Sequence, residues 1–278
     1  MSAADLIRAR AVYLAKAAAR RVLWGPSDLL RSRRAGDRLV PPRSLSFVGA
    51  GDYLATGLQF RDFFVELGGL EPGDRVLDVG CGVGRMAVPL IDYLDGGSYA
   101  GFDTGREMVR WCRRRISSRH PDFEFEWAPV FNAKYNPFGR ESAAEYRFPY
   151  PDSSFDFAFA TSLFTHLARA DAEHYLAELA RVLRPGATCL LTWFLLTPEA
   201  ERELAAGAAM LRFAHPVNGG LTTDRHCPEE AIAYREEIVR AQLAAVDLAV
   251  REPIHHGAWA NAPAAETLQD MIVAERVA

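Results

Sequence analysis

The sequence predicts an α/β fold of the doubly wound kind, in which helices cover both faces of a mostly parallel sheet. Two observations support this prediction. Short apolar runs recur between residues 75 and 196, which is typical of strands buried on both faces. Segments with apolar residues at helical spacing separate these runs, so strands and helices alternate along the chain.

The elements follow in order along the chain. In residues 53–70 the apolar residues have helical spacing, and the pattern ends at Gly68 and Gly69, where a helix is expected to stop. After residue 197 the pattern loosens: residues 236–254 predict a helix followed by a strand, and 266–277 predict a strand that closes the sheet. Between these segments, strands are predicted at residues 75–80, 98–103, 123–129, 155–162 and 188–196, and helices at residues 85–94, 105–116 and 170–183.

Composition limits the class of protein. The 278 residues suffice for one large domain with appendages, and a hydrophobic share of 49% is typical of a soluble globular protein. Cys81, Cys112, Cys189 and Cys227 are scattered, which argues against a disulfide framework or a zinc site and for a reducing compartment. No apolar run approaches the ~18 residues of a membrane-spanning helix, and no signal peptide opens the chain. We therefore expect a cytoplasmic protein.

Charge is distributed unevenly along the chain. Residues 1–43 hold ten Lys and Arg against three Asp, which is a local charge of +7. Because the overall net charge is −4, the remaining residues carry a net charge of −11. We expect a basic N-terminal helical arm and linker over 1–43 and a main domain over 44–278, with insertions at about 130–151 and 197–235.

The basic arm has several interpretations. It could contact a phosphate-bearing substrate, an anionic membrane surface or nucleic acid. Its arginines do not gather opposite its apolar residues, which favours a helix that packs on its own domain. A transit peptide is a further alternative, because the arm is rich in arginine and poor in acids.

A glycine-rich loop, Gly-Cys-Gly-Val-Gly at 80–84, follows the first predicted strand, where doubly wound sheets bind their ligands. The dinucleotide pattern G-x-G-x-x-G fails, because its third glycine would fall at Arg85, and no G-x-x-x-x-G-K-[ST] occurs. Asp78 can accept a hydrogen bond from an amine, and Asp103, which ends the second strand, can accept both hydroxyls of a ribose. A ligand with an amino-acid end and a ribose end is S-adenosylmethionine.

Four segments carry a resemblance to a known family: VLDVGCGVGR (76–85), GFDTGREMV (101–109), RFPYPDSSFDFAFATSLFTHL (147–167) and ELARVLRPGATCLLTWF (178–194). As a set, and over roughly residues 60–196, they resemble the class I S-adenosylmethionine-dependent methyltransferases. The resemblance implies a Rossmann-like sheet of seven strands, mostly parallel with an antiparallel last strand, and S-adenosylmethionine as the cofactor.

The resemblance also implies which residues contact the cofactor. Asp78 and the glycines would line the methionine end, Asp103 would hold the ribose, and Met108 would pack near the adenine. Many relatives end the third strand with an acid that contacts the adenine, but Pro129 stands at about that position here, so Asn132 or the neighbouring main chain could replace it. The expected cofactor-binding residues are Asp78, Gly80, Cys81, Gly82, Gly84, Arg85, Asp103, Thr104, Met108, Val130, Phe131, Asn132 and Ser162.

Methylation of a hydroxyl group is helped by a general base, which near neutral pH is usually histidine. His166 lies just past the carboxyl end of the fourth predicted strand and is the candidate catalytic residue. The alternative is a histidine that caps or packs at the start of the next helix. His226, His255 and His256 fall in predicted loops and are expected at the surface. No cluster with metal-ligand spacing occurs, so we predict no metal.

These patterns predict a methyltransferase that acts on a small-molecule or glycolipid-type acceptor, with oxygen as the expected methylated atom. A cofactor-binding scaffold that does not transfer methyl groups is an alternative, because the adenine position is changed. A nucleic-acid methyltransferase is a second alternative. It is disfavoured because the main domain is acidic and YNPF at 135–138 precedes the fourth strand instead of following it. The sequence leaves the oligomeric state open.

Overall fold

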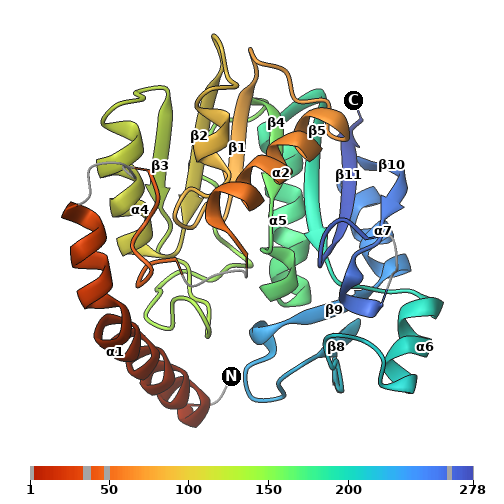
Figure 1. Cartoon of the computed structure of the whole chain (residues 1–278). Coiled ribbons are helices and arrows are strands. Elements are labelled where there is room, and N and C mark those ends of the chain that lie inside the picture. The colour runs from red at the N-terminus through yellow and green to blue at the C-terminus, as the bar shows by residue number, and fades with distance from the viewer. Residues whose placement is uncertain (1–2, 34–38, 47–50, 262–264, 278) are drawn as a thin grey trace. The chain divides into compact units, whose positions relative to one another are not determined.

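The computed structural model of the chain (Figure 1) describes residues 3–33, 39–46, 51–261 and 265–277. The chain forms two compact units, which we call the N-terminal unit (Met1–Arg140) and the C-terminal unit (Glu141–Ala278). The division predicted from charge at residue 43 is a different one, and it stays a prediction.

The N-terminal unit contributes three strands to the main sheet: β1 (Arg75–Val79), β2 (Ser98–Asp103) and β3 (Phe123–Trp127). β2 pairs in parallel with both β1 and β3. β1 is buried on both faces after its first residue, which explains why its sequence is an apolar run interrupted only by Asp78. All three strands begin at the predicted residue and end within two residues of the prediction.

Helices accompany these strands. The helix predicted after residue 53 is present, and its N-cap Asp52 accepts hydrogen bonds from two backbone N–H groups. The helix predicted over 105–116 is α-helical only as far as Cys112 and then continues as a π-helical turn. The helices of this unit are α1 (Ala3–Arg33), α2 (Tyr53–Glu66), α3 (Ala87–Leu90) and α4 (Arg106–Cys112), with the π-helical turn at Arg113–Ser117.

The prediction of a helix over 85–94 was wrong for most of its length, because only the four residues of α3 are helical there. Positive φ angles at Gly82 (53°) and Gly84 (71°) keep the chain before α3 out of the right-handed helix. Pro89, inside the short helix, has no N–H to donate. Turns therefore occupy the carboxyl end of β1.

The C-terminal unit contributes four strands and two helices to the main layer. They are β4 (Phe155–Ala160), α5 (Arg169–Val182), β5 (Leu183–Trp193), α7 (Glu236–Ala244), β10 (Leu248–His255) and β11 (Asp270–Arg276). β4 and β5 are parallel, whereas β11 runs antiparallel to both β5 and β10. The last strand of the chain is therefore antiparallel, as the resemblance implies.

The boundary between α5 and β5 differs from the prediction. α5 ends at Val182, and β5 begins directly at Leu183, five residues before the predicted start of the strand. Pro185 accounts for the difference, because proline disfavours the helical conformation at the preceding Arg184. Leu183 instead pairs with Phe155 of β4.

Residues 195–235 form a small second sheet in the C-terminal unit. One helix and one 3₁₀ turn accompany its four strands. Its elements are β6 (Leu195–Leu196), α6 (Pro198–Ala206), β7 (His215–Val217), β8 (Gly220–Thr222), a 3₁₀ turn at Pro228–Glu230 and β9 (Ile232–Arg235); further 3₁₀ turns lie at Phe164–His166 and Ala258–Ala260.

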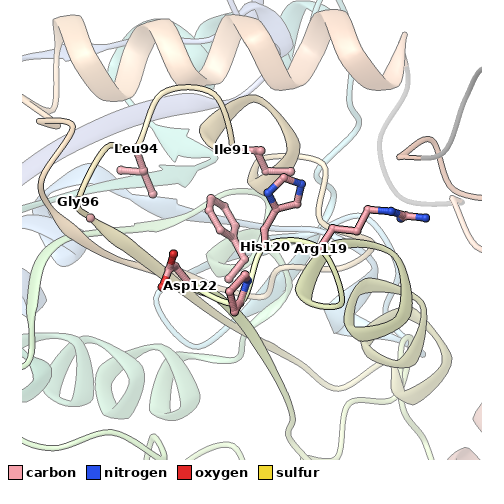
Figure 2. A pocket seen from close by; sticks show the side chains of 9 residues that line it. Ile91, Leu94, Gly96, Arg119, His120 and Asp122 are labelled. Carbon is pink, nitrogen blue, oxygen red and sulfur yellow. The ribbon is translucent and has the colours of Figure 1, made fainter.

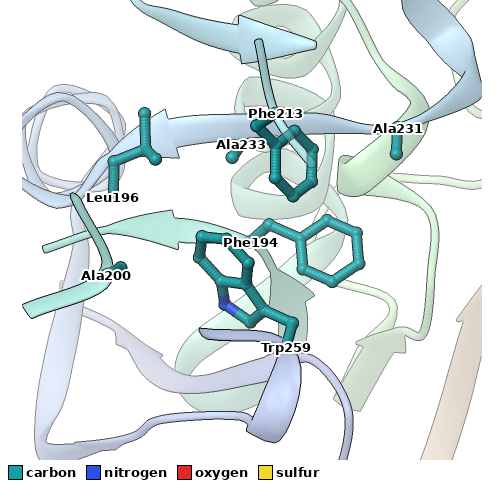
Figure 3. Packing of buried hydrophobic residues seen from close by; sticks show 7 residues of the cluster. All are labelled: Phe194, Leu196, Ala200, Phe213, Ala231, Ala233 and Trp259. Atoms are coloured by element: carbon teal, nitrogen blue, oxygen red, sulfur yellow. The ribbon is translucent and has the colours of Figure 1, made fainter. Parts of the chain in front are cut away.

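An aromatic cluster forms the core beneath this second sheet (Figure 3). The rings of Phe194, Phe213 and Trp259 contact one another with centroids 5.2–5.6 Å apart. Their interplanar angles of 55–86° are the tilted and edge-to-face geometries that aromatic pairs prefer. The cluster gives this segment an apolar core of its own.

Asp270, the first residue of β11, is hydrogen-bonded to Trp259 of this cluster. Its buried carboxylate accepts hydrogen bonds from the Nε1–H of Trp259 (2.7 Å) and from the backbone N–H of Leu195 (2.7 Å) and Gly257 (2.8 Å). His256 lies 3.3 Å from the same carboxylate, which raises the pKa of the imidazole. A buried carboxylate thus joins three separate segments of the unit.

The strands together give the main sheet the order β10-β11-β5-β4-β1-β2-β3, and the second sheet the order β6-β9-β8-β7. A seven-stranded, mostly parallel sheet with an antiparallel last strand confirms the predicted fold class.

Candidate cofactor and acceptor sites

The glycine loop closes against the neighbouring strand β2. The backbone N–H groups of Gly80 and Cys81 both donate to the carbonyl of Phe102, at 2.9 and 3.0 Å. Gly84 packs so closely that an added Cβ would lie 2.9 Å from Ile116 and 3.3 Å from the sulfur of Cys112. The loop therefore needs glycine for both its conformation and its packing.

Asp103 lies at the end of β2, and its two carboxylate oxygens contact this loop and the turn that follows β2. Oδ2 accepts from the N–H of Gly82 (2.8 Å), and Oδ1 accepts from the N–H of Gly105 (2.6 Å). Burial raises the pKa of Asp103, whereas the two backbone donors act in the opposite direction. Each carboxylate oxygen has a second lone pair, so the group can still accept from a ligand.

Asp78 is the other acid of the site and is almost completely buried, with 1% of its surface exposed. The hydroxyl of Tyr99 donates to its Oδ2 at 2.6 Å, whereas its Oδ1 has no hydrogen-bond partner among the described residues. Burial raises the pKa of Asp78 to about 8; the Asp103 carboxylate adds to this effect and the Tyr99 hydroxyl opposes it. An unmatched buried acceptor of this kind fits a donor supplied by a ligand.

An apolar cluster lies beside the loop. Tyr53, Val83 and Met108 are buried together, and the hydroxyl of Tyr53 donates to the carbonyl of Val83 at 2.9 Å. The guanidinium of Arg85 lies 5.8 Å from the centre of the Tyr53 ring. The sequence analysis expected Met108 and Arg85 at this site but missed Tyr53, which lies at the start of α2 and carries no motif.

The residues expected near the adenine form a turn after β3. The Oδ1 atom of Asn132 accepts from the N–H groups of Lys134 and Tyr135, both at 3.0 Å. The side chain of Asn136 donates to the carbonyl of Val130 at 2.8 Å. Phe131, which follows Val130 in the sequence, is half-buried. These contacts shape the turn itself, and an adenine contact from it stays a prediction.

Two other predicted cofactor residues have contacts of their own. The carbonyl of Thr104 accepts from the Nε1–H of Trp127 at 3.1 Å. Ser162 belongs to the C-terminal unit, follows β4 and has a positive φ of 56°, which is uncommon for a residue other than glycine. Its N–H donates to the hydroxyl of Thr192 at 2.7 Å.

Gln269 completes a polar network with these hydroxyl groups. Its Oε1 atom accepts from the hydroxyls of Thr192 (2.6 Å) and Ser162 (3.1 Å). Because Oε1 faces the two hydroxyl groups, Nε2 is the amide atom that points away from them, and it can donate two hydrogen bonds. The sequence analysis did not single out Gln269, because an isolated glutamine gives no signal.

His166 lines a cavity of about 480 Å³ in the C-terminal unit. It ends the 3₁₀ turn after β4, and its Nδ1 lies 2.9 Å from the carbonyl oxygen of Glu229. A carbonyl only accepts, so Nδ1 carries the proton and Nε2 is the ring nitrogen with the lone pair. The cavity is lined by His166, Phe194, Met210, Leu211, Arg212, Thr223, Glu230, Ala231 and Gln269.

The other histidines considered in the sequence analysis lie elsewhere. His226 is exposed and accepts a hydrogen bond from Arg225 at its Nε2. His255 ends β10, and His256 faces Asp270. None of the three lines the cavity that contains His166.

A second cavity, of about 380 Å³, lies in the N-terminal unit where β2 and β3 begin (Figure 2). Residues 119–123 and the pair Gly96 and Gly97 line it, together with Ile91 and Leu94. This cavity lies at the amino-terminal ends of the strands, whereas the glycine loop lies at their carboxyl ends. It is therefore separate from the predicted cofactor site.

Residues 3–33, 39–46, 51–261 and 265–277 contain neither a candidate metal cluster nor a candidate membrane span. In these ranges, no three His, Cys, Asp or Glu side chains are grouped so that they could hold a metal ion. Among the same residues, no helix has the length and apolar character needed to cross a membrane.

Comparison with known proteins shows a family domain within the chain. A family model described as a methyltransferase domain matches residues 77–191. 27-O-demethylrifamycin SV methyltransferase of Amycolatopsis mediterranei is 33% identical over 149 residues, covering 51% of this chain and 49% of that protein. Demethylmenaquinone methyltransferase of Thermus thermophilus is 28% identical over 200 residues, covering 70% of this chain and 83% of that protein. The chain matches about half the length of the first relative.

A solved structure supports the fold. The PH0226 protein from Pyrococcus horikoshii OT3 has a TM-score of 0.56 at 15% identity, covering 88% of this chain and 98% of that one. The matched family segment begins in β1 and ends in β5, and it contains the glycine loop, Asp103 and His166. Residues 77–191 therefore match a methyltransferase domain, and over this segment the chain is similar to the class I S-adenosylmethionine-dependent methyltransferases.

Proposed function

We propose that the protein transfers a methyl group from S-adenosylmethionine to an oxygen atom of a small-molecule or glycolipid-type acceptor, with His166 as the general base. The observation that carries this proposal is the hydrogen bond between Nδ1 of His166 and the Glu229 carbonyl, because it fixes the ring of a histidine that lines a cavity and places the ring proton on Nδ1. The A. mediterranei relative is a methyltransferase of a 27-O-demethyl compound, which supports oxygen as the methylated atom.

The N-terminal unit would hold the cofactor, whose sulfonium supplies an activated methyl group. The unpartnered Oδ1 of Asp78 is suited to an ammonium group, and Asp103 retains lone pairs for ribose hydroxyls. We propose that the cofactor site in the N-terminal unit comprises Asp78, Gly80, Cys81, Gly82, Gly84, Arg85, Asp103, Thr104, Met108, Val130, Phe131 and Asn132; a cofactor contact from Ser162 stays a prediction.

His166 would act on the acceptor hydroxyl. Its Nε2 takes the proton as the hydroxyl oxygen forms the new bond to the methyl carbon and the carbon–sulfur bond breaks. The products are a methyl ether, S-adenosylhomocysteine and a protonated imidazole. The Glu229 carbonyl stabilises that imidazolium through the Nδ1–H hydrogen bond, and the proton then passes to solvent.

The cavity also indicates the chemistry of the acceptor. Phe194, Met210 and Leu211 give it an apolar wall, which suits a largely hydrocarbon or ring-shaped body. Gln269 can donate from Nε2 to an oxygen of the acceptor, because its own oxygen is occupied by two hydroxyls. The proposed acceptor therefore carries a hydroxyl group together with a second oxygen, such as a hydroxyquinone, a catechol or a hydroxylated lipid.

Transfer of labelled methyl groups tests this function. The full chain is incubated with S-adenosylmethionine labelled in its methyl group and with a panel of catechols, hydroxyquinones and hydroxylated lipids. We expect labelled methyl ethers, and we expect His166→Ala to lower turnover about 10²–10⁴-fold with unchanged cofactor affinity. His226→Ala, an exposed histidine outside the cavity, is the control. Equal turnover of His166→Ala and wild type would remove His166 from the mechanism.

A further inference from the structure

An apolar stripe runs along the solvent side of α1, the long dark red helix of Figure 1. Ile7, Leu14 and Val22 are 69%, 55% and 76% exposed, and the exposed Ala11 and Ala18 lie between them. The spacing 7-11-14-18-22 follows one face of a helix, so the stripe is continuous. At 1.5 Å per residue it is roughly 22 Å long, and it ends before Pro26.

Contacts beside the stripe attach α1 to its own unit. The Nε–H of Arg10 donates to the carbonyl of Pro137 at 3.0 Å, and its guanidinium lies 5.2 Å from the centre of the Phe138 ring. Tyr13 meets the same ring edge-on at 6.1 Å. Near the other end, Asp28 accepts from the N–H groups of Arg43 and Ser44. These contacts hold the helix on its own unit, and the residues of the apolar stripe beside them stay exposed.

Basic side chains border the stripe. At 100° per residue, Arg8 and Arg21 lie on opposite sides of it, about 70° from its centre. Both side chains are exposed. An apolar strip between cations suits a surface whose interior is hydrocarbon and whose outer layer is anionic.

We propose that α1 binds the surface of an anionic phospholipid bilayer, with the stripe of Ile7, Leu14 and Val22 inserted between the headgroups and with Arg8 and Arg21 at the level of the phosphates. The helix lies in the plane of the surface and does not span the bilayer. The charge of the helix favours an anionic bilayer over a second copy of the chain. If the stripes of two copies packed together, the arginines of one copy would lie close to those of the other and repel them. This inference is independent of the acceptor and of His166.

Vesicle binding by the full chain tests the proposal. Flotation is measured with phosphatidylcholine vesicles, and with phosphatidylcholine containing about 30 mol% phosphatidylserine, in which basic residues near the surface add to binding. The test variant is Ile7→Ser, Leu14→Ser and Val22→Ser combined. The matched control is Leu23→Ser, which removes an equally exposed leucine (69%) that lies off the stripe. Arg8→Gln with Arg21→Gln tests the charges.

We expect the wild type and Leu23→Ser to float with the anionic vesicles, and the triple variant to lose about tenfold or more of that affinity. The double Gln variant should bind more weakly, and added salt should weaken the wild type. All variants should keep the helical circular dichroism and the S-adenosylmethionine affinity of the wild type, so that a folding defect or a failed cofactor site is recognised separately. Absence of wild-type binding, equal binding by the triple variant, or a wild-type dimer that the triple variant dissociates would overturn the proposal.

Discussion

The Oδ2 atom of Asp103 accepts a hydrogen bond from the backbone N–H of Gly82 at 2.8 Å, so the carboxylate that ends β2 holds the glycine loop that follows β1. The same side chain holds Gly105 through its other oxygen. One carboxylate therefore fixes two loops at the carboxyl end of the sheet before any ligand binds. In the proposed function it must do so while it also accepts from the cofactor ribose.

Replacement of Asp103 should reduce stability as well as cofactor affinity. Asp103→Ala leaves the N–H groups of Gly82 and Gly105 without their acceptor, and we expect it to lower the free energy of unfolding by about 1–3 kcal/mol. Urea unfolding of the full chain measures this loss. The control is Glu124→Ala, which removes an exposed carboxylate from β3. An unchanged urea midpoint for Asp103→Ala would show that these hydrogen bonds do not hold the loops.

Cofactor binding should release protons from Asp78. Its pKa is raised to about 8, so the group is mostly protonated at pH 7 in the free protein. A ligand ammonium at Oδ1 would favour the ionised form, and the affinity for S-adenosylmethionine should therefore rise with pH up to about 8 and then level off. Calorimetry at pH 7 in buffers of different ionisation enthalpy measures the protons released. Asp78→Asn should release none at this site; equal release by wild type and variant would contradict the assignment.

Gly84 should not tolerate a side chain. Its φ is +71°, and an added Cβ would lie 2.9 Å from Ile116. We expect Gly84→Ala to destabilise the protein by roughly 1–3 kcal/mol, because both the backbone strain and the overlap act in the folded state. Gly73→Ala is the matched control, since nothing lies within 4 Å of its added Cβ and its φ is not in the left-handed region. Similar urea midpoints for the two variants would refute this account of the loop.

The pair of His256 and Asp270 should make stability depend on pH. The Asp270 carboxylate raises the pKa of His256 in the folded state above its usual value of 6.5. The protonated pair therefore contributes its full stability below about pH 6.5, and the contribution is lost as the pH rises through the folded-state pKa. His256→Gln should remove this part of the pH dependence of Tm, whereas the exposed His226→Gln should retain it. The same pH slope in His256→Gln and wild type would contradict the pairing.

Much of the fold could be predicted because strands that are buried on both faces have apolar sequences. The segment 98–103 is apolar, begins after Gly97 and ends at Asp103, and β2 has those bounds. The apolar spacing of 85–94 is helical, but the positive φ angles at Gly82 and Gly84 before it and Pro89 inside it accompany a helix of only four residues. Tertiary geometry overrode local pattern there.

The candidate site could be predicted only in part. Asp78 and Asp103 stand next to glycine motifs, and the structure brings both to the glycine loop. Three other residues could not be found, because each makes its contact with residues that are distant in sequence. Tyr99 contacts Asp78, and Tyr53 contacts Val83. Gln269 contacts both Ser162 and Thr192. Such pairings depend on strand register and loop shape, which motif spacing does not encode.

The most direct test of the cofactor site is a calorimetric titration of the full chain with S-adenosylmethionine, beside Asp78→Asn and Asp103→Ala variants that retain the wild-type circular dichroism. We predict binding at one site per chain, weakened about tenfold or more in each variant, which corresponds to about 1.4 kcal/mol or more. Binding of equal strength by the wild type and both variants would place the cofactor elsewhere and contradict the site built from β1, β2 and the glycine loop.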